Sequence, residues 1–148
     1  MAFHFPLESV LHFRVSLEHQ QELRLRAANQ KVARVRHLIE QANQRSRELH
    51  AMQLTWLGAG MTAAELRFEL QCEAELQRER HNLEQQLVAL QKLCEQQREL
   101  FQRAKRARET LESVRDRQLV LYQKDSARRE QRQLDNLFLM RRQYLRRG

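Results

Sequence analysis

Apolar side chains recur along residues 7–56 at alternating steps of four and three residues, the spacing that keeps them on one face of a supercoiled helix. The pattern is unbroken from Leu25 to Ala42, where Val32, Val35 and Ile39 supply β-branched side chains. The whole seam runs through Leu7, Leu11, Arg14, Glu18, Gln21, Leu25, Ala28, Val32, Val35, Ile39, Ala42, Ser46, Leu49, Gln53 and Trp56. It predicts one long helix that packs along a partner.

A second seam of the same kind occupies the next part of the chain. Its apolar members are Leu66, Leu70, Leu76, Leu83, Leu87, Leu90, Cys94, Phe101, Ala104 and Leu111, interrupted by the polar residues Glu73, Arg80, Gln97 and Arg108. Beyond Leu111 the spacing points to Arg115, whereas the apolar residue is Val114, and the stripe then passes to Gln118 and Leu121. A slip of this kind ends or overwinds a supercoil.

Two glycines separate the seams. Gly58 and Gly60 favour the end of a helix, and Thr62 with Glu65 has the spacing of a capping box at the start of the next. A connection this short favours an antiparallel pair. The sequence predicts an all-α fold, a long two-helix antiparallel coiled-coil hairpin in a single domain 1–148, with helices at about 6–57 and 62–146 and a turn at 58–61. One continuous rod, kinked at the glycines within a structural homodimeric coiled coil, stays open as an alternative.

The last part of the chain is expected to be a helical overhang. Equal distances from the turn place Leu7 opposite about residue 112, so residues 113–148 have no predicted partner in the chain. An apolar cluster lies there among arginines, and such a stripe in a basic helix calls for another protein or a surface to cover it. The cluster consists of Leu134, Leu137, Phe138, Met140, Tyr144 and Leu145.

The net charge of +8 belongs to the same region. Residues 1–102 hold 13 basic and 13 acidic side chains, and residues 103–148 hold 14 basic against 6 acidic ones. Such an uneven distribution of charge along the chain predicts that the basic part binds an acidic partner. A basic coiled coil that binds nucleic acid non-specifically is a second hypothesis. Specific base recognition is not expected, because the region lacks the interleaved asparagines and aromatic platforms of a base reader.

Several functions are not expected from the residues present. With three glycines and no predicted pocket, the chain offers no phosphate-binding loop, so an enzyme, a cofactor and a small-molecule substrate are all unexpected. The six histidines show no metal-ligand spacing, so a metal site is unexpected too. No apolar run approaches the roughly 20 residues that span a bilayer, and a cytoplasmic protein is predicted. Trp56 is expected to seal the end of the seam, or alternatively to be a contact site.

The two ends of the chain resemble a known family. The opening Phe3-His4-Phe5-Pro6-Leu7-Glu8-Ser9-Val10-Leu11-His12-Phe13-Arg14 is similar to the start of the FliJ family of flagellar export proteins, with Phe-x-Phe-x-Leu, then Val-Leu, then Arg. The stretch from Arg129 to Arg142 resembles the family's closing Glu-Gln-Lys-x-Leu-Asp-Glu segment. Arg132 and Asn136 depart from it, standing where the family commonly has Lys and an acid.

The resemblance implies a non-catalytic component of the flagellar type III export apparatus, peripheral at the cytoplasmic face of the inner membrane. Such a protein is a stalk that enters the ring of the hexameric flagellar export ATPase, contacts the export gate membrane protein and hands over export chaperones. The terminal motifs favour the flagellar branch over a related injectisome stalk. The residues expected to bind the ATPase ring are Phe5, Leu7, Val10, Leu11, Arg14, Arg128, Arg129, Gln131, Arg132, Leu134, Asp135, Leu137 and Arg141.

Overall fold

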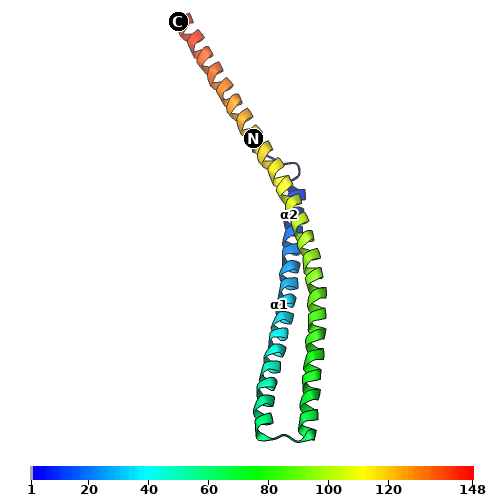
Figure 1. The fold of residues 1–148 in the computed structure, drawn as a ribbon. Helices are drawn as coiled ribbons and strands as arrows, with labels where there is room; N and C mark the ends of the chain where they lie inside the picture. Colours follow the sequence, from blue (N-terminus) through cyan, green and yellow to red (C-terminus); the bar gives the residue numbers. More distant parts are fainter. Residues whose placement is uncertain (1) are drawn as a thin grey trace. The chain divides into compact units, whose positions relative to one another are not determined.

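The computed structural model describes residues 2–148, which form two α-helices and no strand: α1 (Glu8–Ala59) and α2 (Ala63–Arg147) (Figure 1). The fold is the all-α antiparallel coiled-coil hairpin with a helical overhang that the two seams predicted. The chain divides into two compact units. Unit one comprises Met1–Glu18 with Arg103–Gly148, and unit two comprises His19–Gln102.

The turn in unit two consists of residues 60–62. Gly60 has a φ of +91°, a left-handed conformation that a side chain would strain. Gly58 and Ala59 remain in α1, so α1 ends slightly later than the predicted 57. The capping box is confirmed: the Thr62 amide donates to Glu65 Oε2 at 2.9 Å, and the Glu65 amide donates to Thr62 Oγ1 at 3.3 Å.

The core of unit two follows the predicted seam. Val32, Val35 and Ala42 of α1 and Cys94 of α2 are buried. Polar contacts cross between the helices beside them: Cys94 Sγ donates to Asn29 Oδ1 at 2.9 Å, and Arg80 lies 3.4 Å from Asn43 Oδ1. The residue numbers of the pairs rise on α1 as they fall on α2, so the helices are antiparallel, as Figure 1 also shows. Polar partners within an apolar seam fix its register.

Near the turn the seam differs from the prediction. Glu69 is only 2% exposed, whereas Leu70, which was assigned to the seam, is 53% exposed. The reason is geometric, because steps of three and four back from Leu76 fall on Glu73, Glu69 and Leu66. Both carboxylate oxygens of Glu69 lack a hydrogen-bond partner. A charged side chain therefore occupies a core position that the apolar pattern gave to its neighbour.

Trp56 does not close the end of the seam. Its side chain is 43% exposed. It lines an open hollow of about 500 Å³ together with Met61 and Phe68. The predicted role as a seal is therefore wrong, and the turn end of unit two has an apolar recess instead.

Unit one begins with a short non-helical segment, residues 2–7. The Glu8 amide donates to the Phe5 carbonyl at 3.1 Å, which forms a turn into α1. Pro6 lies within this turn, just before the helix and not inside its first turn. The side chains of Phe5 in this segment and of Leu11 in α1 are buried. The segment thus packs against α2 as an extension of the seam.

This segment extends the paired region beyond the predicted limit near residue 112. Arg115 Nε lies 3.3 Å from Glu8 Oε2, and the rings of Phe3 and Tyr122 are 5.6 Å apart between centroids. Between these two contacts five residues, from Phe3 to Glu8, run beside seven residues of α2, because a non-helical chain can advance further per residue than a helix. The prediction that residues 113–122 lack a partner is therefore wrong.

The overhang proper is shorter than expected. Leu119 and Tyr122 are half-buried, whereas Leu121, which was assigned to the stripe, is 60% exposed. Every residue from 127 to 148 is exposed, and α2 stays helical to Arg147. We call residues 127–148 the overhang from here on.

Candidate docking surface of unit one

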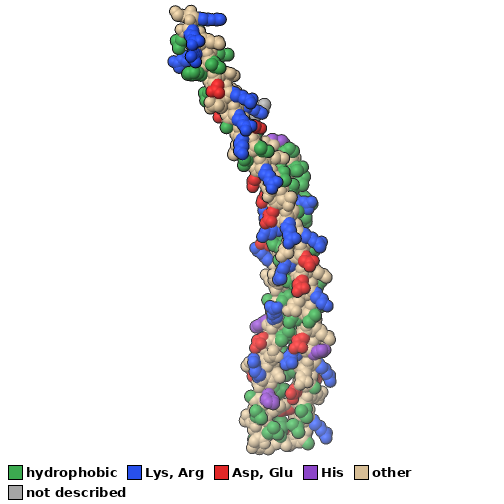
Figure 2. All heavy atoms as spheres, turned by 45° about the horizontal axis from the view of Figure 1, so that its top comes forward, with side chains coloured by type: hydrophobic (Ala, Val, Ile, Leu, Met, Phe, Trp, Pro, Cys, Tyr) green, Lys and Arg blue, Asp and Glu red, His purple; other side chains and the backbone are tan. Residues whose placement is uncertain are grey.

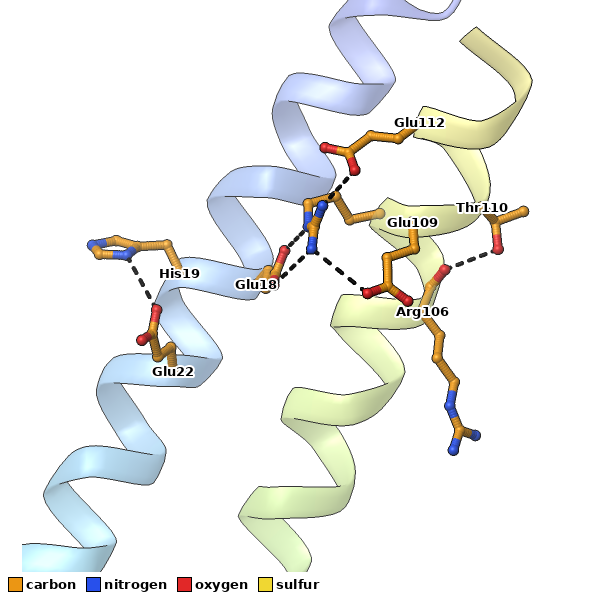
Figure 3. A network of polar contacts seen from close by, with 8 residues as sticks. Glu18, His19, Glu22, Arg106, Glu109, Thr110 and Glu112 are labelled. Carbon is orange, nitrogen blue, oxygen red and sulfur yellow. Dashed lines mark hydrogen bonds and ion pairs between the residues drawn. The ribbon is translucent and has the colours of Figure 1, made fainter. Parts of the chain in front are cut away.

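An ion-pair network joins the two helical segments of unit one. The Arg108 guanidinium donates to Glu18 of α1 through Nε and Nη2, and to Glu112 Oε2 of α2 at 2.5 Å through Nη1. Glu109 lies at 3.9 Å from the same guanidinium. Figure 3 shows Glu18, Glu109 and Glu112 converging from the two helices. We call this network the Arg108 clamp.

The electrostatics of the clamp favour the charged state. Hydrogen bonding to Glu18 is the main cause that raises the pKa of Arg108, hydrogen bonding to Glu112 adds to it, and partial burial opposes both. Arg108 and Glu18 are each about four-fifths buried as side chains. A charge-assisted contact at this depth is screened less by salt than a surface ion pair. The clamp therefore holds the start of α1 to α2 at a fixed position.

The N-terminal residues predicted to bind a partner differ in accessibility. Phe5 and Leu11 are buried, so they pack within unit one. Leu7 and Val10 are exposed, and Arg14 is half-buried. Only part of this set is available to a partner without rearrangement.

The C-terminal residues predicted to bind a partner are all exposed on the overhang. These are Arg128, Arg129, Gln131, Arg132, Leu134, Asp135, Leu137 and Arg141. Two local contacts order them: Gln131 donates to Asp135 at 3.0 Å, and Arg128 lies 3.9 Å from Asp125. The two sets do not form one patch, because Phe3 reaches only Tyr122 and the C-terminal set starts six residues, about 9 Å, further along α2.

The overhang has two distinct faces. Leu134, Phe138, Arg141 and Leu145 follow one another at steps of three and four residues and thus share a face, flanked by Leu137 and Tyr144. The same steps through Arg128, Arg132, Asp135, Leu139, Arg142 and Arg146 describe a second face, about 100° further round the helix. In Figure 2 blue basic and green apolar side chains both lie along this helix, in the upper part of the view. An amphipathic helix with a basic face suits an acidic partner that also has an apolar groove.

Other kinds of site are not found in the part of the chain that the structure describes. Within residues 2–148, no group of three or more His, Cys, Asp or Glu side chains could hold a metal ion. Neither α1 nor α2, over the same residues, contains a stretch long and apolar enough to cross a bilayer.

The family model of the flagellar FliJ protein matches residues 3–148. The chain belongs to the FliJ family. No curated protein and no solved structure matches it. Membership in the FliJ family assigns the chain to flagellar protein export, as a non-catalytic component. The match covers both terminal motifs and the hairpin between them.

Two features of this FliJ-family surface were not foreseen. The sequence marked Glu18 and Arg108 as polar interruptions of the two seams, but their opposite charges and near-equal distances from the turn were the signal that they pair. The contact of Phe3 with Tyr122 had no such signal, because an extended segment has no helical period.

Proposed function

We propose that this FliJ-family protein is a non-catalytic stalk of the flagellar type III export apparatus, and that unit one docks in the ring of the hexameric export ATPase. The observation that carries the proposal is the overhang, a helix whose residues are all exposed and which has an apolar face and a basic face. An isolated helix of this length is marginal in water. A ring with an acidic or mixed lining would supply the missing contacts.

The Arg108 clamp supports a mechanical part of this proposal. A stalk must transmit position along its length, and the clamp with the buried Phe5 holds the two segments of unit one together near the start of α1. Leu7 and Val10 are exposed in the N-terminal part of unit one and offer a second, separate contact surface. Bound to the ring, the stalk promotes ring assembly and ATP turnover while taking no part in the chemistry.

We further assign the export gate membrane protein and the export chaperones to the outward faces of unit two. Exposed apolar side chains gather near the turn, including Leu54, Leu57 and Phe68. Exposed apolar clusters of this kind mark contact sites more often than scattered single residues do. The gate and the chaperones would thus bind away from the surface that enters the ring.

The test is ATP hydrolysis by the purified cognate export ATPase with and without this protein. Replacing Arg128, Arg129 and Arg132 by Glu reverses the charge of the basic face and should abolish stimulation. The matched control replaces Lys31, Arg34 and Arg36 by Glu, three exposed basic residues of unit two, and should leave stimulation unchanged. Full stimulation by the overhang variant would refute the proposed docking.

Non-specific nucleic-acid binding is measured in the same preparation. The hypothesis of non-specific binding predicts that the protein binds duplex DNA of any sequence and that the affinity falls steeply as salt is raised. Absence of binding at moderate salt removes that alternative.

A further inference from the structure

The apolar face of the overhang is an uncovered apolar feature of unit one. The side chains of Leu134, Leu137, Phe138, Tyr144 and Leu145 are each more than half exposed. They lie within three helical turns of one another on a helix that continues to Arg147. No segment of residues 2–126 lies over them, because every residue from 127 to 148 is exposed.

The charge around this face is strongly positive. The overhang holds seven arginines against two acidic residues, Glu130 and Asp135, which leaves a net charge of +5. Arg142 and Arg146 line one hollow together with Phe138 and Leu145, so these guanidinium groups border the apolar face. Arg141 lies within the apolar face, where a long side chain can keep its charged end in water while its methylenes stay apolar.

The exposed apolar face and the positive charge together indicate which partner can cover the overhang. A second overhang is disfavoured, because two helices of charge +5 would repel each other. An anionic bilayer matches both faces: the apolar side chains enter the boundary between headgroups and acyl chains, and the guanidinium groups bind lipid phosphates. Phe138 and Tyr144 are aromatic, a type of side chain that favours this boundary.

We propose that the overhang, when it is not docked in a protein partner, binds flat to the surface of an anionic lipid bilayer. Leu134, Leu137, Phe138, Tyr144 and Leu145 insert at the interface, and the arginines contact lipid phosphates. Neither helix of residues 2–148 is apolar enough to cross a bilayer, so the binding is peripheral and reversible. The ATPase ring and the bilayer would compete for the same helix, since both need its apolar face.

The experiment is flotation of the full chain with vesicles, in the absence of any ATPase. Vesicles of phosphatidylcholine with about 30% phosphatidylglycerol should carry the protein, and vesicles of phosphatidylcholine alone should carry at least about ten-fold less. Raising the salt to about 0.5 M should reduce binding, because screening weakens attraction to the surface. Equal binding to both kinds of vesicle, or no binding to either, would overturn the proposal.

A matched pair of variants tests the face. Phe138 and Leu139 are neighbours and both exposed, but Phe138 lies on the apolar face and Leu139 on the second face, about 100° further round the helix. Phe138→Gln should lower the bound fraction several-fold, and Leu139→Gln should leave it unchanged. Equal losses in the two variants would show that general hydrophobicity, and not a defined face, causes binding.

Fluorescence gives an independent reading of depth. Trp56 is the single tryptophan and lies in unit two, so the Trp56→Phe variant has no tryptophan emission of its own. In that background Phe138→Trp should shift its emission to the blue on anionic vesicles, whereas Leu139→Trp should not. Circular dichroism before vesicles are added confirms that each variant keeps its helices. Emission from Phe138→Trp that stays unchanged on anionic vesicles would contradict insertion.

Discussion

Glu18 of α1 accepts hydrogen bonds from Arg108 of α2 at a level of unit one where both helices present a polar residue to the seam. Each residue alone would place a charge in an apolar seam. Together they neutralise each other, and Glu112 accepts a further hydrogen bond from Nη1 of the same guanidinium. The pairing also fixes the register, because a slip of either helix would leave the charges unpaired.

Arg108→Ala should destabilise unit one by about 1–3 kcal/mol, because it leaves the partly buried Glu18 without its charged donor. Replacing both partners by apolar residues, Arg108→Met with Glu18→Leu, should restore most of the loss. Urea unfolding followed by circular dichroism measures both variants. If the double variant is less stable than Arg108→Ala, apolar packing does not substitute for the pair.

The clamp should be insensitive to pH in the neutral range. The pKa of Arg108 is raised in the folded chain, so its contribution is present at every pH below the unfolded-state pKa of arginine, which is far above the neutral range. It is lost only as the pH rises through the still higher folded-state pKa. The stability difference between wild type and Arg108→Ala should therefore stay constant between about pH 7 and 9. A difference that shrinks over this interval would argue against the clamp.

Phe5→Ala should release the N-terminal segment from α2. Phe5 is 3% exposed, and truncating a buried phenylalanine costs about 3 kcal/mol or more. Hydrogen exchange should rise at the start of α1 and around Tyr122, whose ring contacts Phe3. Phe13→Ala is the matched control, since Phe13 is 62% exposed and its loss should change stability by less than about 0.5 kcal/mol.

Glu69→Leu should stabilise unit two by roughly 1–3 kcal/mol. Both Glu69 oxygens are buried without a hydrogen-bond partner, and an apolar side chain removes that desolvation penalty. Glu75→Leu serves as the control, because Glu75 is exposed and its replacement should be nearly neutral. Thermal unfolding compares the two, and a loss of stability in Glu69→Leu would show that the carboxylate has a partner or a solvated conformation.

The glycines of the turn should respond in opposite directions. Gly60→Ala places a side chain at a φ of +91° and should cost about 1–2 kcal/mol. Gly58 lies within α1 with no atom close to a new Cβ, so Gly58→Ala should stabilise by about 0.5–1 kcal/mol. Melting temperatures that move the same way in both variants would contradict the assigned turn.

The sequence predicted the features that depend on a regular apolar period or on a helix cap. The unbroken period between Leu25 and Ala42 located the core of unit two, and Thr62 with Glu65 located the start of α2 to within a residue. Both are local signals. A strict spacing or a single side-chain hydrogen bond is enough to specify each of them.

The residues that the sequence placed wrongly lie where the side-chain type favours one position and the backbone geometry favours another. At Glu69 and Leu70 the apolar residue was preferred, although the helical steps place the acid in the seam. The position of residues 2–7 along α2 depends on a non-helical backbone, whose advance per residue a heptad count does not include. At the candidate docking surface, the sequence indicated the exposed residues of the overhang but not the burial of Phe5 and Leu11.

The cationic groups of the overhang are all arginines, since residues 127–148 contain no lysine. A guanidinium stays protonated throughout the physiological range. Acetylation, which discharges lysine side chains, has no target in this segment. The attraction of the overhang to an anionic partner is therefore constant in sign and size, and only ionic strength or a competing partner can regulate it.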